Sequence, residues 1–432
     1  MIDTRSETLT QAPVANRLLS SMQGSEILRI AYEVQALIAE GRRIANFTIG
    51  DFDPTTFPIP AELKQFVFEA YEAGQTNYPQ AMGNPGLRQA IGAYYEAGLG
   101  SSVAPDEIAD GRGIRPLIYA LYMTAVEPGE AIVYGLPAWN TAAYVRLSRA
   151  ADCGLATRAE DNFLLTAERV RPYLPEAAVL ALCSPSNPSG TMFDRSQLDE
   201  LCAAVLDEND RRHRQHRKPL YVLYDQVYWQ FGHSREHVHP IGLRPEMQAF
   251  TVYADGLSKS FAATGLRLGW CAGPRELVRL ISNLVGFIGA WAPKPEQLAT
   301  ARYLPLFEAQ RSYILELGSQ MYERLRKVER RITALQERGL PVGCIAPQGG
   351  LFLSIRCDLR GATTPDGHRL ETSEQMRRYI LLDGGCAFVP FAAFDAPNSP
   401  DWFRASVSSL ADADIDQGLD QLETALTALR YP

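Results

Sequence analysis

The sequence predicts an α/β fold built around an open, mainly parallel sheet. Between about residues 110 and 293, short apolar or β-branched runs alternate with helical patterns, which is typical of a parallel sheet covered by helices. The chain has 432 residues with 46% hydrophobic content and is long enough for one large core and a smaller second one. Polar residues collect just beyond several apolar runs. Because ligands bind at the carboxyl ends of strands in such sheets, these residues are candidates for a functional site.

Five short runs are the clearest strand candidates, because each is apolar or β-branched and is bounded by turn residues. They cover residues 131–134, 178–183, 221–224, 251–254 and 267–271. A long amphipathic pattern over 304–338 predicts a helix, which Gly339 and Pro341 end. We expect this helix to lead into a second domain.

The second domain is predicted to be discontinuous and of α+β type. Its strand-like run 350–355 and helical run 374–382 have no partner nearby except the N-terminal region, so the residues before about 60 are expected to pack with them. The expected limits are 1–60 for an N-terminal arm with part of the small domain, 61–303 for the large domain and 304–432 for the rest of the small domain.

Composition argues against several classes of protein. A net charge of -8 and 21% charged residues give no signature of a nucleic-acid or anionic-membrane partner. No stretch reaches the roughly 18 apolar residues that cross a bilayer, and residues 1–23 lack the apolar run of a signal peptide. The seven cysteines are odd in number, widely spaced and free of C-x-x-C pairs, which disfavours disulfides and zinc and favours a reducing cytoplasm.

Lys259 stands in a loop of small residues, GLSKSFAATGLRLGW, which also carries Ser258 and Arg267. Most lysines are solvated surface charges, and that remains the alternative for this one. Among Gly, Ala, Ser and Thr its amine is poorly solvated. This environment lowers the pKa of the amine and makes it a nucleophile toward an aldehyde.

Asp225 ends the apolar run of YVLYDQVYWQF, and Tyr228 follows three residues later. A carboxylate at the end of a buried strand is costly to desolvate and needs a cationic partner, for which the ring nitrogen of pyridoxal phosphate is a candidate. The tyrosine is then placed to reach the phenolic oxygen of that ring. The alternative is an aspartate that caps the next helix.

Asn187 lies in the turn of ALCSPSNPSGTMF, directly after another strand candidate. Its amide can donate to the same phenolic oxygen, although Asn-Pro near Gly is also an ordinary turn. The sequence resembles the class I/II aminotransferases of fold type I in four features taken together. These are N-P-S-G at Asn187, D-x-x-Y at Asp225, S-K at Lys259 and Arg267 eight residues after the lysine. The spacings of 38 residues from Asn187 to Asp225 and 34 from Asp225 to Lys259 carry the resemblance.

The resemblance extends from about residue 50 to residue 404 and implies a three-layer αβα large domain. It also implies a pyridoxal 5'-phosphate cofactor bound to Lys259 as a Schiff base, with Asp225 and Tyr228 as the other catalytic residues and Asn187 in contact with cofactor and substrate. TNYPQAMGNPGLR matches the segment whose tyrosine, here Tyr78, reaches the cofactor phosphate of a neighbouring subunit. A homodimer is therefore expected.

GRGIRPLIYAL matches the family's phosphate-binding turn, with Gly113, Ile114 and Arg115 as its residues. Backbone N–H groups at a helix N-terminus suit a phosphate without special side chains. Ser258 and Arg267 are expected to supply the remaining phosphate contacts.

Three more positions follow from the same resemblance. Trp139 in YGLPAWNTAAY matches an aromatic ring that stacks on the cofactor, with a core tryptophan as the alternative. Arg404 in WFRASVS matches the arginine that clamps the substrate's α-carboxylate, a task that suits a planar guanidinium fork. Gly50 in NFTIGDFDP matches the glycine whose loop lies over that carboxylate, or marks a simple turn.

Arg115 departs from the family pattern, in which this position is more often a small polar residue or a lysine. We hypothesise that it recognises an acidic group on an amino acid or 2-oxo acid; the alternative is that it only neutralises cofactor phosphate. GFIGAWAPKP, where relatives specific for dicarboxylates place an arginine of the neighbouring subunit, has none. Aspartate specificity by that route is not expected.

Two other motifs are interpreted as surface features. The histidines of HSREHVH (His233, His237 and His239) have no cysteine or clear helix nearby to support a metal site, and no metal is expected. The basic run RRHRQHRK over 211–218 is interpreted as a solvated loop.

The expected function is transfer of an amino group between an amino acid and a 2-oxo acid. The same residues serve lyases, synthases and decarboxylases that use this cofactor, so those reactions stay open. A non-catalytic regulator is a remote alternative, because the roughly 35 residues ahead of the first β-like run are too few for a DNA-binding domain.

Overall fold

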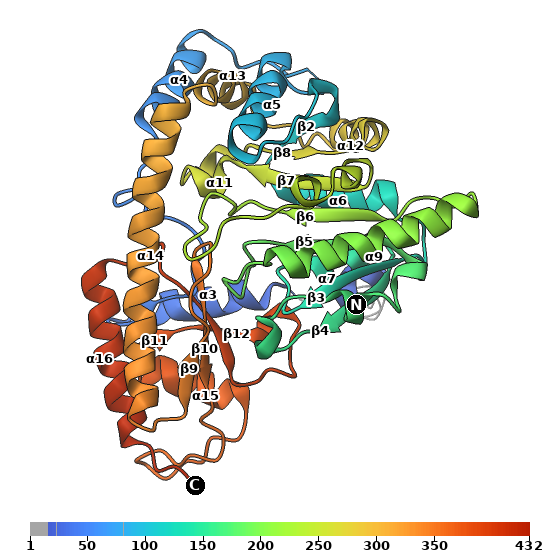
Figure 1. Ribbon diagram of the computed structural model, residues 1–432. Helices are drawn as coiled ribbons and strands as arrows, with labels where there is room; N and C mark the ends of the chain where they lie inside the picture. Colours follow the sequence, from blue (N-terminus) through green and yellow to red (C-terminus); the bar gives the residue numbers. More distant parts are fainter. Residues whose placement is uncertain (1–15, 23, 81) are drawn as a thin grey trace, which may run out of the picture.

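A seven-stranded sheet forms the centre of the large domain in the computed structural model, which describes residues 16–22, 24–80 and 82–432 (Figure 1). All neighbouring strands pair in parallel except β8, which is antiparallel to both of its neighbours. The predicted mainly parallel sheet is confirmed. The strand order is β2 (Ile108–Gly111), β8 (Gly269–Ala272), β7 (Thr251–Gly256), β6 (Tyr221–Asp225), β5 (Ala177–Cys183), β3 (Ala131–Leu136) and β4 (Ala151–Ala156).

Helices cover both faces of this sheet. Successive side chains of a strand point to opposite faces, so neighbouring residues pack into different cores. In β6, Val222 and Tyr224 pack into one core and Leu223 into the other. The first core also contains α4 (Ala61–Glu72), α5 (Pro85–Leu99), α8 (Ala167–Val170), α9 (Arg195–Arg214), α10 (Pro240–Leu243) and α13 (Lys294–Tyr303). The second contains α6 (Ile114–Ala125), α7 (Thr141–Leu147) and α12 (Arg275–Phe287).

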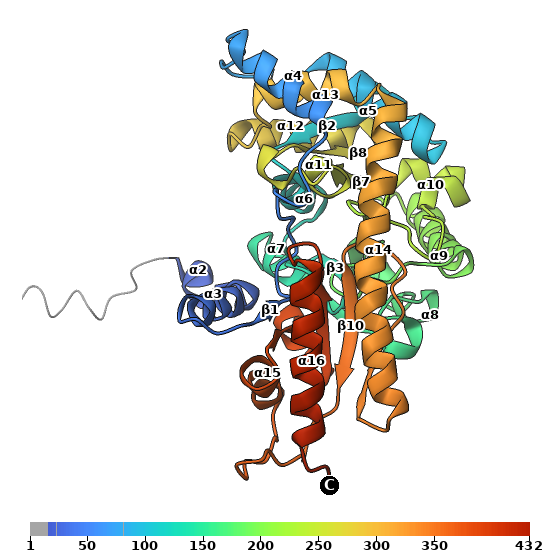
Figure 2. The same cartoon turned by 90° about the vertical axis from the view of Figure 1, so that its left-hand side faces the viewer.

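The small domain contains a four-stranded antiparallel sheet in the order β12 (Val389–Pro390), β13 (Trp402–Ser406), β10 (Phe352–Cys357) and β9 (Val342–Cys344). Its helices are α14 (Phe307–Glu337), α15 (Ser373–Leu382) and α16 (Asp412–Ala428). The predicted long helix is α14, which runs from beside α4 in the large domain down to the end of the small domain (Figure 1, Figure 2). Buried apolar residues recur along it every three or four positions, as in Leu317, Met321, Leu325, Val328 and Ile332.

The N-terminal segment packs with the small domain. Strand β1 (Ala45–Asn46) pairs in parallel with β11 (Cys386–Ala387), and α3 (Glu26–Ala39) buries Ile30 and Val34 in a cluster with Phe391. A short helix, α2 (Arg17–Ser21), precedes α3. We propose domain limits of 1–60, 61–303 and 304–432 for the arm, the large domain and the small domain, although residues 1–15 lie outside the described part of the chain.

Two strands of the large sheet lie outside the five predicted runs. β4 reads ADCGLA and is an edge strand whose residues are all exposed or half-buried, so it lacks the apolar run of its neighbours. β2 has only four residues and occupies the opposite edge. The strand predicted over 267–271 begins later, at Gly269, because Arg267 has a left-handed backbone with φ of 55°.

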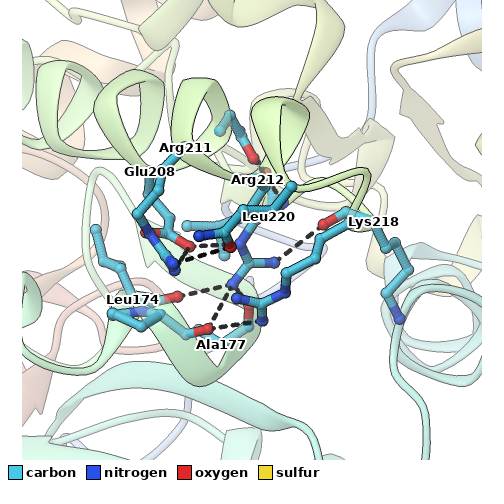
Figure 3. Close-up of polar contacts among 11 residues, drawn as sticks. Leu174, Ala177, Glu208, Arg211, Arg212, Lys218 and Leu220 are labelled. Carbon is cyan, nitrogen blue, oxygen red and sulfur yellow. Dashed lines mark hydrogen bonds and ion pairs between the residues drawn. The ribbon is translucent and has the colours of Figure 1, made fainter.

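The basic run 211–218 is a solvated loop only from residue 215 on, so that prediction is wrong for the first half of the run. Its first four residues form the last turn of α9, where cations face the negative end of the helix dipole. Arg212 is only 2% exposed, and its Nε atom lies 2.6 Å from Glu208. Its Nη2 atom donates to the carbonyl oxygens of Leu174 and Ala177 at 2.8 and 2.6 Å (Figure 3). The side chain therefore satisfies carbonyl groups at the start of β5.

The predicted surface position of the histidines is also wrong. His239 is buried, with Nδ1 2.7 Å from the hydroxyl of Tyr253, and His233 and His237 are half-buried. Burial lowers the pKa of His237 to about 3, so the ring is neutral. Within the described ranges, no three His, Cys, Asp or Glu side chains gather to hold a metal, and no helix combines the length and apolarity of a membrane span.

Candidate active site

A cavity of about 810 Å³ lies where the carboxyl ends of β5 and β6 meet the small domain. The last residues of these strands, Cys183 and Asp225, are paired in the sheet and line the cavity. The opposite wall comes from residues 48–51 of the N-terminal segment and from β10 and β13. The predicted site residues that line this one cavity are Gly50, Ile114, Arg115, Trp139, Asn187, Asp225, Tyr228, Ser258, Lys259, Arg267 and Arg404.

Lys259 lies in the single helical turn α11 (Leu257–Ser260), directly after β7. Its Nζ atom donates to the carbonyl oxygen of Gly50 at 2.5 Å. Burial, opposed by Asp51 and assisted by the nearby cations of Arg404 and Arg115, lowers the pKa of this amine from 10.5 to about 8. About a tenth of the amine is therefore unprotonated and nucleophilic at pH 7, and the fraction rises as the pH approaches 8.

Asp225 presents a carboxyl group to the cavity from the end of β6. Its Oδ1 atom accepts a hydrogen bond from the backbone N–H of Val227 at 3.2 Å. No ion pair to Asp225 is found in the part of the chain that the structure describes. Burial raises the pKa of this carboxyl to about 6, which leaves an anion without a cationic partner at neutral pH.

Arg404 reaches into the same cavity from β13 and is only 3% exposed. It donates to the side-chain oxygen of Asn187 at 3.0 Å and to the carbonyl oxygen of Thr48 at 2.7 Å. Its guanidinium lies over the ring of Phe352, and its Nε atom has no hydrogen-bond partner in the described structure. Burial lowers its pKa to about 10, so it is still a cation at neutral pH. It forms no ion pair within the described part of the chain.

Tyr228 is buried beside Asn187, and the two side chains form a hydrogen bond. Burial raises the pKa of the tyrosine, so its hydroxyl stays protonated at neutral pH. Asn187 thus connects Tyr228 of the large domain with Arg404 of the small domain.

The N-terminus of α6 faces Arg267 at another end of the cavity. Gly113 precedes the helix with φ of 80°, and a Cβ atom there would lie 2.5 Å from Nη2 of Arg267, so this position requires glycine. Arg267 donates to the carbonyl oxygens of Thr264 at 2.7 Å and Arg112 at 3.3 Å. Ser258 lines the cavity nearby. Backbone N–H groups, a hydroxyl and a guanidinium are suited to an anion.

Arg115 and Trp139 form a stacked pair, with the guanidinium carbon 4.4 Å from the ring centre. One face of the tryptophan is thus covered by the arginine. Arg115 is exposed and has no hydrogen bond or ion pair within the described residues, so its charge is free to meet an anion in the cavity.

Tyr78 does not line the cavity of its own chain. Its side chain is 84% exposed, and its ring packs edge-on against Trp291 with centres 5.7 Å apart. A large aromatic side chain with this exposure is available to a neighbouring molecule.

The sequence reasoning missed residues that close the site. The hydroxyl of Thr264 donates to Asp51 at 2.6 Å, which ties the N-terminal segment to the loop between Lys259 and Arg267. Thr48 accepts from Arg404, and Tyr144 also lines the cavity. Asp51 directly follows the predicted Gly50, but an aspartate in a turn gives no sign of a partner more than 200 residues away.

Comparisons with known proteins agree with this geometry. Residues 42–422 match the family model described as aminotransferase class I and II. An aspartate aminotransferase of Rhizobium meliloti is 27% identical over 95% of this chain and 96% of its own length. An aspartate/prephenate aminotransferase of Thermus thermophilus is 25% identical over 88% of this chain and 92% of its own.

The solved structures show the same relationship. The crystal structure of the Rhizobium meliloti aspartate aminotransferase has a TM-score of 0.87 and 26% identity, and the match covers 97% of this chain and 100% of that one. The chain therefore belongs to the class I and II aminotransferase family and is a pyridoxal phosphate-dependent aminotransferase of fold type I.

Proposed function

We propose that Lys259 holds pyridoxal phosphate covalently and that Asp225 faces the ring nitrogen of the cofactor. Asp225 carries the proposal, because it is an anion in the cavity wall that has one backbone hydrogen bond and no cationic partner among the described residues. A protonated ring nitrogen supplies the missing charge. Asn187 and Tyr228 are proposed to contact the phenolic oxygen of the ring, and Trp139 to stack on its face.

The N-terminus of α6 fits the cofactor phosphate. The backbone N–H groups at Gly113, Ile114 and Arg115 begin this helix, and Arg267 lies close enough to Gly113 to exclude any side chain there. Arg267 has carbonyl groups as its hydrogen-bond partners. A doubly charged phosphate beside Arg267 and Ser258 would balance this positive end of the cavity.

When bound, the cofactor supplies an aldehyde and an electron sink for negative charge at the substrate's α-carbon. The neutral amine of Lys259 is proposed to accept the proton of that carbon and to release it later in the transfer. Arg404 is proposed to hold the substrate's α-carboxylate together with Asn187, under the loop that contains Gly50. Phe352 on one face of the guanidinium helps to exclude water from this contact.

We infer that one substrate is an acidic amino acid or 2-oxo acid, recognised by Arg115. The cavity contains the guanidinium groups of Arg115, Arg267 and Arg404, whereas the carboxylates among its described lining residues are those of Asp51 and Asp225. Phosphate and α-carboxylate account for two of the arginines. A second carboxylate on the substrate would pair with the third, Arg115, which has no hydrogen bond or ion pair within the described residues. The names of the two relatives, an aspartate and an aspartate/prephenate aminotransferase, agree with an acidic substrate.

We also infer a homodimer in which Tyr78 reaches the cofactor phosphate of the neighbouring subunit. The support is its 84% exposure, together with exposures of 88% for Phe287 and 50% for Ile288 near the same end of the large domain. Exposed apolar side chains of this size mark protein interfaces. A cytoplasmic location is inferred from the cysteines, all seven of which are free thiols.

A spectroscopic half-reaction screen tests the function. The purified protein is loaded with pyridoxal phosphate, and its visible absorbance is followed as single amino acids are added without an acceptor. Acidic amino acids are expected to bleach the chromophore at the lowest concentrations and to leave pyridoxamine phosphate. Lys259→Ala is the control and should show no reaction. If the loaded protein shows no chromophore, the cofactor assignment is refuted. If all amino acids bleach the chromophore equally, the substrate assignment is refuted.

A further inference from the structure

Asp255 is a carboxyl group that the reaction does not use, buried behind the active site. It lies near the end of β7, and none of its surface is exposed. Its Oδ2 atom accepts from the indole N–H of Trp229 at 2.8 Å, and Oδ1 accepts from the backbone N–H of Gly256 at 2.7 Å. The hydroxyl of Tyr95 completes its hydrogen bonds. No ion pair to it exists among the described residues.

These contacts connect the two loops that carry the proposed cofactor-binding residues. Trp229 directly follows Tyr228 in the loop after β6, and Asp255 precedes Lys259 by four residues. In the parallel register of β6 and β7, Asp225 pairs with Ala254. Asp255 therefore points to the opposite face of the sheet, away from the cavity and toward α5.

The surroundings of Asp255 oppose a negative charge. Asp225 is the nearby acid, Tyr94 and Tyr95 of α5 are buried phenols, and no cation faces Asp255 from any of these elements. An ionised carboxylate without water or a cation is costly, and the charge on Asp225 adds repulsion. Burial raises the pKa of Asp255 well above its ordinary value, and Asp225 adds to this effect, while the hydrogen bonds from Gly256, Trp229 and Tyr95 oppose it without cancelling it.

The hydrogen-bond network accommodates a proton at Asp255. The hydroxyl of Tyr95 already accepts from the indole N–H of Trp270 at 2.9 Å and is bonded to the side chain of Gln226. With its own hydrogen on Gln226, Tyr95 can accept a second hydrogen from a carboxylic acid at Asp255. The oxygens of that acid still accept from Trp229 and Gly256.

We propose that Asp255 is a positioning residue that stays protonated at neutral pH and, as a neutral acid, ties the loop of Asp225 and Tyr228 to the turn of Lys259. The role rests on the proposed cofactor site, since it holds two of the residues assigned there. It leaves Asp225 as the one negative charge of the pair, free to face the ring nitrogen.

Three variants test this role. Asp255→Asn replaces a neutral acid by a neutral amide of the same shape, and Asp255→Leu removes the bridge. The control, Asp199→Asn, changes a half-buried aspartate on α9 that is paired with Arg244. The infrared spectrum at neutral pH should contain the carbonyl band of a protonated acid, which only the variants at 255 lose. Asp255→Asn should retain wild-type cofactor affinity and the wild-type pH midpoint of the cofactor absorbance. Asp255→Leu should weaken cofactor retention about tenfold or more and move that midpoint.

The possible outcomes separate the two claims. If the wild type and the variants at 255 show the same infrared carbonyl bands, Asp255 is ionised in the wild type and the proposal is overturned. Equal cofactor affinity and pH midpoint in wild type and Asp255→Leu would overturn the positioning role. If Asp255→Leu does not fold, Trp229→Phe, which removes one donor, provides the same comparison. Failure of the wild type to take up cofactor would instead refute the proposed function, while the infrared result would still decide the protonation of Asp255.

Discussion

The amine of Lys259 lies 2.5 Å from the carbonyl oxygen of Gly50, so the proposed cofactor lysine is bonded to the N-terminal segment. One residue further, Asp51 accepts from Thr264 in the loop that follows the lysine. Two adjacent contacts therefore join the wall of the cavity from residues 48–51 to the wall from the large domain. The environment of the amine depends on both walls, since burial and Asp51 have opposite effects on its pKa.

Lys259→Met should change how the stability of the cofactor-free protein depends on pH. The folded pKa of about 8 lies below the ordinary value of 10.5, so wild-type stability is highest above 10.5 and falls as pH decreases toward 8. The variant lacks this pH-dependent loss. When the pH is lowered from 10.5 to 7, its free energy of unfolding should therefore rise by about 1–2 kcal/mol relative to that of the wild type, a value reduced to allow for the partial exposure of Lys259. Urea unfolding at the two pH values measures this, and a pH-independent difference would contradict it.

Arg404→Lys should lower kcat/KM about 100-fold or more while leaving the absorbance of the bound cofactor unchanged. A lysine cannot reach Asn187 and Thr48 while also forming a two-point contact with a carboxylate. Steady-state kinetics and a spectrum of the loaded variant measure the two effects. A fall in cofactor affinity of similar size would show that Arg404 acts on the cofactor rather than on the substrate.

Arg115→Gln should remove selectivity for acidic substrates. The expected loss is about tenfold to 100-fold in kcat/KM for a dicarboxylic amino acid, because one charge-assisted hydrogen bond is lost. The rate with an uncharged amino acid should stay within about twofold of wild type. An equal loss for both substrates, with weaker cofactor retention, would support the alternative that Arg115 neutralises the cofactor phosphate.

Mixed dimers test whether Tyr78 acts across a subunit interface. Tyr78→Phe should weaken cofactor retention about tenfold in the homodimer. A hybrid of one Tyr78→Phe chain and one Lys259→Ala chain contains a site with both native residues if the tyrosine comes from the partner. One site per hybrid should then bind cofactor with wild-type affinity, as measured by dialysis and absorbance. A weakened site in the hybrid would place Tyr78 in the active site of its own chain.

Arg212→Ala should destabilise the protein by about 1–3 kcal/mol, because it removes the donor to the carbonyl oxygens of Leu174 and Ala177 and leaves Glu208 with Arg211 as its remaining cation. Arg214→Ala, at an exposed position in the same helical turn, is the matched control and should change stability by less than about 0.5 kcal/mol. Chemical denaturation of both variants measures the difference. Similar values would mean that the buried contacts contribute little.

The sequence predicted features that depend on local pattern. Five apolar runs and the long amphipathic stretch correspond to β3, β5, β6, β7, β8 and α14, because apolar periodicity reflects burial directly. β4 escaped prediction because an edge strand is only partly buried. Arg212 was misread because a basic run has the same composition whether its side chains face water or backbone carbonyls.

In the candidate site, too, some features follow from local pattern and others depend on contacts between distant segments. Asn187, Asp225 and Lys259 follow strands, so their convergence at one sheet edge was predictable from order along the chain. The pairing of Thr264 with Asp51 depends on how the N-terminal segment lies over the large domain. Local pattern contains no information about such a contact.

The parallel pairing of β1 with β11 has a consequence for synthesis of the chain on the ribosome. Residue 45 emerges early, but its partner at 386 follows about 340 residues later, roughly half a minute at ordinary translation speed. The nascent protein must therefore hold this strand unpaired while the large domain is completed. Arg404 leaves the ribosome later still, so a prematurely terminated chain would contain Lys259 and Asp225 but lack the arginine assigned to the substrate.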